Sequence, residues 1–203
     1  MKRRRSATQP MILSCLAGFV LAGCAQTSLT STYPAVQGLP RPDRVLVYDF
    51  AVTPADAAIE RRSGAATQTA EDVEVGKALA RALSVNLISE LRRRGIEAER
   101  ASETDGPGET TASVRGAFLH TDASATSVPV GFTLRGGQVR TRIQFLQGTG
   151  LKLQNVGEGE TVTPSVLKPG MAGDSAINAD AKRIAEVLAE RVAGYYRREG
   201  WIK

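Results

Sequence analysis

The apolar positions of residues 69–95 repeat at the spacing of an α-helix. Apolar side chains recur every fourth residue along one stripe, at Val75, Leu79, Leu83, Leu87 and Leu91. Thr69 followed by Asp72 matches a capping box, which marks a helix start. Three arginines at 92–94 precede Gly95, and cations followed by glycine are typical of a helix end. The pattern predicts a long amphipathic helix over residues 69–94.

A second stripe of this kind runs through residues 175–198. Its apolar positions on one face are Ile177, Ala181, Ile184, Ala185, Leu188 and Val192. This spacing predicts a second long amphipathic helix at the end of the chain. Asp174 and Ser175 stand at its start, and we interpret them as its capping residues.

Five shorter stretches have the pattern of β-strands. Residues 45–50 are a continuous apolar and β-branched run, which is typical of a strand buried on both faces and therefore central in a sheet. Residues 139–145 alternate apolar and polar side chains, as a strand with one wet face does. Residues 96–100, 112–120 and 151–156 complete the set.

The order of these elements defines a fold class. A strand, a helix and a second strand in succession favour a parallel pair joined by a right-handed crossover. We therefore predict an α/β chain of the two-layer α+β kind, with a mixed sheet of four to five strands packed against two long amphipathic helices. The glycine pairs Gly148/Gly150 and Gly157/Gly159 match neither a dinucleotide-binding nor a phosphate-binding loop, and we interpret them as turns.

Residues 1–23 have the three parts of a secretory signal. Residues 2–5 are basic, residues 11–21 are mainly apolar, and small residues follow. The apolar run of 11 residues is too short to cross a bilayer, which takes about 20 residues. The segment therefore predicts export with removal of the signal, and no later segment is long and apolar enough to span a membrane.

The signal ends in Leu21-Ala22-Gly23-Cys24, which resembles the lipobox of bacterial lipoproteins at all four positions. The resemblance implies cleavage between Gly23 and Cys24 and attachment of acyl chains to Cys24. Two or three such chains, at about 0.8 kcal/mol per buried methylene, hold a protein on a membrane without a spanning helix. The alternative is an ordinary cleaved signal with a chance cysteine. Ala25, where inner-membrane lipoproteins have aspartate, favours the periplasmic face of the outer membrane in a Gram-negative cell.

These features divide the 203 residues into a signal peptide (1–23), a lipidated tether (24–42) and a single domain (43–203). The formal net charge of +5 falls to +1 once the four basic residues of the signal are removed, so a nucleic-acid partner is disfavoured. Cys15 leaves with the signal and Cys24 carries lipid. The mature domain therefore has no cysteine for a disulfide, a metal or a nucleophile.

Candidate catalytic residues are few. His120 is the only histidine, which excludes a two-histidine metal motif. A triad of a serine, His120 and either Asp49 or Asp122 stays formally open. The block 173–175 (Gly-Asp-Ser) superficially resembles the nucleophile block of one esterase family, which lies near the N-terminus in that family and not near the C-terminus. We expect no catalytic residue, no cofactor and no metal, and hence a protein that is not an enzyme.

Two groups of charged residues have alternative interpretations. Asp49 follows the predicted central strand at its carboxyl end, where open α/β sheets bind ligands, but it equally suits a cap of the turn at Thr53. Arg135, Arg140 and Arg142 suit an anionic glycan or lipid head group, or simply form a solvated strand face.

Three aromatic residues gather near the C-terminus, namely Tyr195, Tyr196 and Trp201. Aromatic side chains with a polar group are enriched at interfaces, so this cluster is a candidate docking surface. Such a cluster also closes the end of a hydrophobic core, and both interpretations stay open.

The lipobox and short tether, together with residues 44–50, 91–95 and 137–143, resemble an uncharacterised family of bacterial lipoproteins, catalogued as DUF forty-four-ten. The similarity covers most of residues 42–200. Its motifs are structural, so the resemblance implies no activity and no site residues.

We therefore expect an outer-membrane lipoprotein, held on the periplasmic face through lipid on Cys24, that docks another protein of the cell envelope without catalysing a reaction. One alternative is a hydrolase of envelope lipids or glycans. Another is an oligomeric component of a secretion system, and the oligomeric state stays open.

Overall fold

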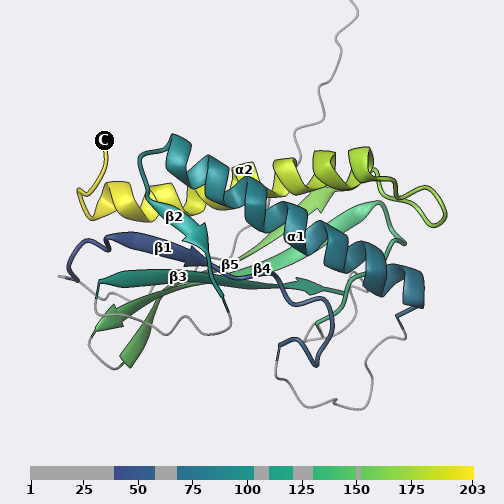
Figure 1. Ribbon diagram of the computed structural model, residues 1–203, viewed down its shortest axis with the longest axis horizontal. Coiled ribbons are helices and arrows are strands. Elements are labelled where there is room, and N and C mark those ends of the chain that lie inside the picture. The colour runs from purple at the N-terminus through teal and green to yellow at the C-terminus, as the bar shows by residue number, and fades with distance from the viewer. Residues whose placement is uncertain (1–38, 58–67, 103–109, 121–129, 150–151) are drawn as a thin grey trace, which may run out of the picture.

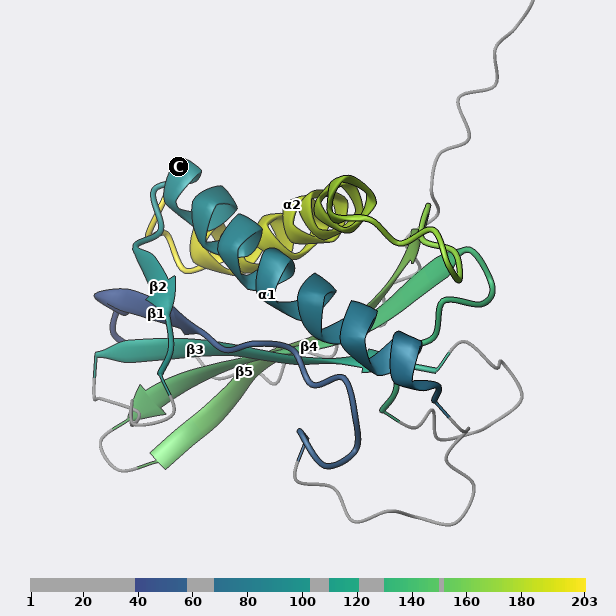
Figure 2. The same ribbon diagram turned by 45° about the vertical axis from the view of Figure 1, so that its right-hand side comes forward.

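The protein was analysed as a computed structural model, which describes residues 39–57, 68–102, 110–120, 130–149 and 152–203. The elements, in chain order, are β1 (Arg44–Val47), α1 (Ala70–Arg93), β2 (Ala98–Arg100), β3 (Thr111–Leu119), β4 (Gln138–Thr149), β5 (Lys152–Pro164) and α2 (Asp174–Arg198). Both helices lie side by side on the same face of the sheet (Figures 1 and 2). The predicted two-layer α+β fold with a mixed sheet and two long helices is confirmed.

The five strands lie in the order β2-β1-β3-β4-β5. β1 pairs in parallel with both β2 and β3, whereas β3, β4 and β5 form an antiparallel meander. The parallel β1–α1–β2 connection that the sequence predicts is present. β1 is internal to the sheet, and Val45, Leu46 and Val47 are all buried, as its unbroken apolar run predicts.

Local signals define both ends of α1. Thr69 and Asp72 form a reciprocal capping box, in which each side chain accepts a hydrogen bond from the other residue's backbone N–H. At the C-terminus Gly95 has φ +75°, and its N–H donates to the Arg92 carbonyl. The N–H of Ile96 donates to the Leu91 carbonyl, and both side chains are buried. This is the Schellman arrangement, in which glycine provides the left-handed residue that ends the helix.

Asp72 also connects α1 to a distant segment. Its Oδ1 accepts from the Leu134 N–H at 2.9 Å, while Oδ2 accepts from the backbone N–H and the hydroxyl of Thr69. Burial by itself raises the pKa of this carboxyl, but these hydrogen bonds outweigh it and hold the pKa below its ordinary value. Asp72 therefore holds the chain before β4 against the start of α1.

The cap of α2 differs from the prediction. The N-cap residue is Gly173, and no side chain caps the helix, so the interpretation of Asp174 and Ser175 as its caps was wrong. Asp174 lies within the first turn, where a carboxylate interacts favourably with the helix dipole. The segment before α2 is held instead by the fully buried Asp180, which accepts hydrogen bonds from the Ser165 hydroxyl and the Val166 N–H.

The hairpin of β4 and β5 is longer than the pattern predicts. Gly157 and Gly159 are not turns, because they lie within β5, directly opposite Phe145 and Ile143 of β4. Gly148 likewise lies within β4, while Gly150 falls outside the described residues. Each of the two glycines of β5 lies opposite a large apolar residue of β4. Because glycine has no side chain, it leaves room for the side chain of that residue to pack into the core. The low strand propensity of glycine is thus overridden by cross-strand packing.

The last residues of the predicted tether already pack against the domain. Leu39 contacts the core, Pro42 is buried, and the carbonyl of Pro40 accepts a hydrogen bond from the Gln147 side chain at 2.5 Å. The amide oxygen of Gln147 accepts in turn from the Tyr195 hydroxyl. Packing of the chain against the helix-covered core therefore starts by Leu39, before the boundary at residue 43 that the composition predicts.

Asp72 generates the first prediction. We expect Asp72→Asn to lower the free energy of unfolding by about 1–3 kcal/mol at neutral pH, because an amide has only one acceptor oxygen for three donors. Since the pKa is lowered by folding, the contribution is complete above the ordinary pKa of 3.8 and is lost as the pH falls through the folded value. Urea titrations across pH 3–7 should therefore show a shallower acid dependence for the variant. Asp174→Asn, in the first turn of α2, should lose only the dipole contribution, about 0.3–1 kcal/mol.

A pair of helical glycines generates the second prediction. A Cβ at Gly76 of α1 would lie 2.5 Å from Val52 Cγ1 and 3.0 Å from Phe132 Cδ1, whereas a Cβ at Gly194 of α2 meets nothing within 4 Å. We expect Gly76→Ala to cost about 1–3 kcal/mol through overpacking. Gly194→Ala should instead stabilise by about 0.5–1 kcal/mol, since alanine is the better helix former. Thermal unfolding of the two variants would contradict the packing argument if both shifted in the same direction.

Candidate functional site

The face of the sheet opposite the helices carries a row of large polar side chains across neighbouring strands. Arg115 of β3 pairs directly with Gln144 of β4, so their side chains project side by side. On the other flank, the N–H of Tyr48 donates to the Val114 carbonyl, which places Tyr48 beside Arg115. The Arg115 guanidinium lies 4.4 Å from the centre of the Tyr48 ring. This cation–π contact holds the guanidinium over the ring.

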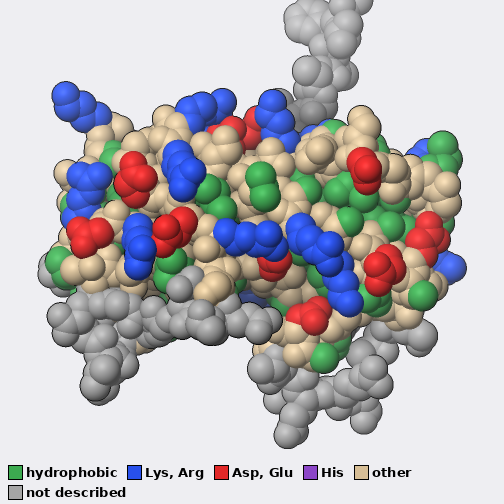
Figure 3. Space-filling model, viewed as in Figure 1, with side chains coloured by type: hydrophobic (Ala, Val, Ile, Leu, Met, Phe, Trp, Pro, Cys, Tyr) green, Lys and Arg blue, Asp and Glu red, His purple; other side chains and the backbone are tan. Residues whose placement is uncertain are grey.

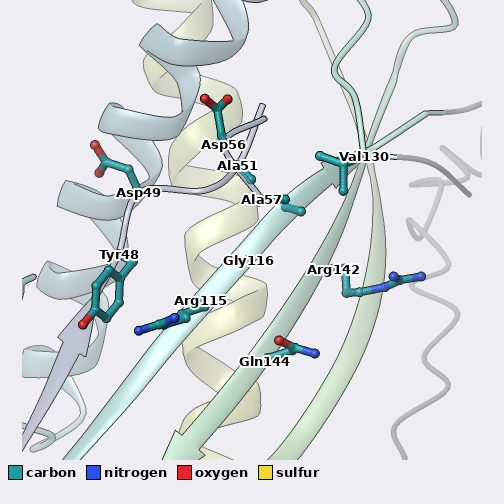
Figure 4. A pocket seen from close by; sticks show the side chains of 11 residues that line it. Tyr48, Asp49, Ala51, Asp56, Ala57, Arg115, Gly116, Val130, Arg142 and Gln144 are labelled. Carbon is teal, nitrogen blue, oxygen red and sulfur yellow. The ribbon is translucent and has the colours of Figure 1, made fainter. Parts of the chain in front are cut away.

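Small residues continue the same face beyond this row and leave a hollow. Ala117 follows Arg115 on the face and forms an isolated parallel bridge with Ala51. Ala51, Ala57, Ala117 and Val130 form the apolar part of the lining, next to the buried Leu119. The hollow has a volume of about 430 Å³, and Figure 4 shows the side chains around it. It exists because alanines stand where larger side chains would fill the sheet face.

On the β4 side the hollow is bounded by Arg142, which extends away from Arg115 (Figure 4). Arg142 Nη2 lies 2.6 Å from Glu160 Oε1, and Arg140 Nη2 lies 2.8 Å from Glu160 Oε2. Burial by itself raises the pKa of Glu160, but the hydrogen bonds from Arg142 and Arg140 outweigh it and lower the pKa. Glu158 adds a second carboxylate 3.9 Å from Arg142. The two arginines of the predicted wet face are therefore paired within the sheet.

Asp49 and Asp56 bound the hollow on the side of the chain that follows β1, and their carboxylates point away from Gln144 and Arg115 (Figure 4). Asp49 forms an ion pair with Arg100. Asp56 Oδ2 accepts from the backbone N–H groups of Val52 and Thr53, at 3.1 and 2.8 Å. The turn at Thr53 is thus capped by Asp56 and not by Asp49, as one interpretation of the sequence expected. Asp49 is instead paired with Arg100 at the end of β2.

Arg115 and Gln144 differ from these charged groups. Within the described parts of the chain, no carboxylate lies in ion-pair distance of Arg115, and no hydrogen-bond partner meets the Gln144 amide. Arg115 is exposed and Gln144 is half-buried. The hollow therefore presents one cation and one amide whose hydrogen-bonding groups are available, next to an apolar surface of small residues.

The catalytic alternatives do not assemble in the described residues. His120 is buried, and neither ring nitrogen has a hydrogen-bond partner in the ranges that the structure describes, so no serine or aspartate there is bonded to it. Ser175 is exposed in the first turn of α2, and Asp122 lies outside the described residues. No group of three or more histidine, cysteine, aspartate or glutamate side chains suited to a metal occurs in the described ranges.

The C-terminal aromatic residues belong to the core. Tyr195 and Tyr196 are buried, and Trp201 is half-buried with ring centres 5.5 and 5.1 Å from theirs. Phe145 packs against both tyrosines from the sheet. Burial raises the pKa of Tyr195 to about 12 and that of Tyr196 further. This arrangement favours the interpretation in which the cluster closes one end of the core, because neither tyrosine offers a surface to a partner.

The remaining predicted positions lie elsewhere. Arg135 is exposed before β4, outside the lining of the hollow. Gly23 and Cys24 fall outside the described residues, as do the signal and most of the tether. In the described ranges, neither long helix has an apolar stretch that would suit a membrane span.

Sequence reasoning missed Tyr48, Arg115, Gln144 and Ala117 as a set. The available signal was Arg115, a charged residue that interrupts the otherwise apolar or small run of residues 112–120. Its neighbours across the sheet follow from the register of β1, β3 and β4, which the pattern of a single strand does not contain.

No protein-family model matches the chain, and no curated protein sequence matches it. Among solved structures it is similar to two crystal forms of a PelC dodecamer from Paraburkholderia phytofirmans. They share 14% and 13% identity with it, cover 80% of this chain and 97% of theirs, and have TM-scores of 0.40 and 0.39. A protein of Xanthomonas campestris from the family DUF330 shares 12% identity over 83% of this chain and 94% of its own, with a TM-score of 0.38. Likenesses at these TM-scores carry no inference about function or assembly.

The pairing of Glu160 generates the third prediction. We expect Glu160→Gln to release Arg140 and Arg142, so that the sheet face binds polyanions more strongly. The variant should elute from a heparin column at higher salt than Glu97→Gln, which makes the same charge change at an exposed position. Equal elution of the two variants would mean that the two arginines are not neutralised by Glu160.

Proposed function

We propose that this protein is a periplasmic lipoprotein of the outer membrane, anchored through Cys24, that docks another component of the cell envelope without catalysing a reaction. The docking site in this proposal is the hollow on the helix-free face of the sheet. The observation that carries it is a pair of polar side chains, Arg115 and Gln144, that have no ion-pair or hydrogen-bond partner among the described residues and lie beside the apolar lining. A concave, partly apolar site with a few convergent polar groups is typical of ligand binding.

The anchor in this proposal rests on the lipobox-like residues 21–24 and on the resemblance to the uncharacterised lipoprotein family. The described end of the predicted tether, residues 39–42, lies apart from the hollow. Leu39 packs against the core between the sheet and the helices, and Pro40 is bonded to Gln147 beneath Tyr195. Leu39 and Pro40 therefore join the domain away from the residues that line the hollow.

The charges around the hollow support docking over hydrolysis. A hydrolase needs a nucleophile or an activated water with a base in hydrogen-bond reach. Asp49 is paired with Arg100, and Asp56 is bonded to two backbone N–H groups. His120, the natural base, is not part of the lining. The side chains around the hollow are thus suited to recognition.

The helix side of the molecule supplies a matched control surface. Basic and acidic side chains are interspersed over the side that carries α1 (Figure 3). Arg81 is exposed in α1 and faces away from the core. A crosslinking probe placed at position 81 therefore measures non-specific contact with other proteins of the same compartment.

The fourth prediction concerns contacts in living cells. We expect a photoreactive phenylalanine analogue in place of Gln144 to give discrete covalent adducts on irradiation, whereas the analogue in place of Arg81 gives none. When the Gln144 probe is combined with Cys24→Ser, we expect the protein to leave the membrane fraction. The adducts should also become weaker, because the anchor raises the effective concentration of the domain near a membrane-bound partner. Immunoblots of the membrane and soluble fractions give the readout.

Two outcomes would contradict the proposal. Adducts of equal yield from both positions would show that contact is non-specific, and no adduct from position 144 would remove the hollow as a docking site. Membrane retention of the Cys24→Ser protein would remove the lipid anchor.

A further inference from the structure

The surroundings of Arg115 indicate which chemical group the hollow would bind. Its guanidinium lies over Tyr48 at 4.4 Å and has no carboxylate partner in the described residues, unlike Arg100, Arg140 and Arg142. A planar guanidinium held over an aromatic ring loses little rotamer entropy when it binds, and its N–H groups match the two oxygens of a carboxylate. Arg115 thus has no anionic partner among the described residues, and an anionic oxygen group of a ligand would fit that place.

Gln144 adds a neutral donor and acceptor next to this cation. It is the direct cross-strand partner of Arg115, so an anion held by the guanidinium lies within reach of the amide. An amide satisfies the remaining oxygen of a carboxylate, or the N–H of the group attached to it. The pair is suited to a carboxylate that belongs to an amide-containing chain.

The opposite side of the hollow disfavours a polyanion. Asp49 and Asp56 are among the lining residues on that side, Asp49 in an ion pair with Arg100 and Asp56 bonded to two backbone N–H groups. Like charges repel, so a ligand with several negative groups would meet unfavourable interactions there. A single carboxylate followed by N–H donors suits both sides of the hollow.

The apolar lining selects what lies beside the carboxylate. Ala51, Ala117 and Val130 present methyl groups to a hollow of about 430 Å³, which has room for a short peptide end and offers an apolar contact to its last side chain. An acidic sugar would need an aromatic face for stacking, and the one aromatic ring in the lining is already covered by Arg115 on one side. The surroundings favour a peptide end over a saccharide.

We propose that the hollow binds the C-terminal carboxylate of a peptide whose last residue is small and apolar, with Arg115 and Gln144 holding the carboxylate. This inference deepens the proposed docking function and rests on it. The peptide end has two sources in the cell envelope, a protein C-terminus of L-residues and a cell-wall peptide that ends in D-residues. The shared chemistry is the free carboxylate beside a methyl group.

The test is a titration of the full chain, purified in detergent, with short peptides, followed by ligand-observed NMR. The probes are N-acetyl-Ala-Ala in its L,L and D,D forms, and the C-terminal amide of each. We expect at least one carboxylate form to bind and its amide to bind about tenfold or more weakly, because the amide removes the charge that Arg115 recognises. The form that binds more tightly identifies the source.

Variants assign the contact. Arg115→Gln should weaken the carboxylate form at least about tenfold, and Arg115→Lys should fall between it and the native protein because it keeps the charge without the planar group. Arg81→Gln makes the same charge change on α1 and should leave the affinity unchanged. Ala117→Leu should abolish binding by filling the hollow while Arg115 stays in place. Thermal unfolding of each variant confirms that it is folded.

Several results would overturn the proposal. One is a peptide amide that binds as tightly as the free acid, and another is an Arg115→Gln protein with native affinity. A third is that neither the L,L nor the D,D peptide binds. A fourth is that glucuronate or inorganic phosphate binds as tightly as the peptide. The failures are separable. Adducts from position 144 in cells without peptide binding would remove this ligand class and leave the docking function, whereas peptide binding without adducts would do the reverse.

Discussion

The placement of both long helices on one face of the sheet is the constraint on which the other features depend. The helix-covered face buries the large apolar side chains of β1, β3 and β4, from Val45 to Phe145. The opposite face has no helix over it in the described residues, so its charged side chains must be stabilised by cross-strand partners or by water. Glu160 with Arg140 and Arg142 is one such local solution, and Arg115 over Tyr48 is another.

The core itself is not purely apolar, and this affects how its stability is distributed. The hydroxyls of Thr141, Thr161 and Thr163 are buried and meet no hydrogen-bond partner in the part of the chain that the structure describes, and Thr141 and Thr161 are direct cross-strand neighbours. Each buried polar atom without a partner costs free energy that apolar packing elsewhere must offset. Buried carboxylates that are bonded to backbone and side-chain donors act in the opposite direction: Asp72 and Asp180 hold the segments near the N-terminal ends of α1 and α2, which lie next to each other.

How far the sequence predicts this structure depends on the range of each signal. α1 and its ends follow from residues within one turn of each other, Thr69 with Asp72 and Arg92 with Gly95, and the prediction is confirmed there. The second half of β5 does not follow, because Gly157 and Gly159 become strand residues only through their partners on β4. The site fails to follow for the same reason. Arg115, Gln144 and Tyr48 are far apart in the chain and meet only through strand register.

The contrast between Arg142 and Arg115 shows why register, and not composition, sets what this face can bind. Both arginines project from neighbouring strands onto the same face. Arg142 lies directly opposite Glu160, which neutralises it, whereas Arg115 lies opposite Gln144, which cannot. The residue that register places opposite each arginine thus decides whether its guanidinium stabilises the sheet or remains available to a ligand. A paired charge contributes little further binding energy, whereas an unpaired one beside an apolar surface contributes more, so the recognition we propose for this face centres on Arg115.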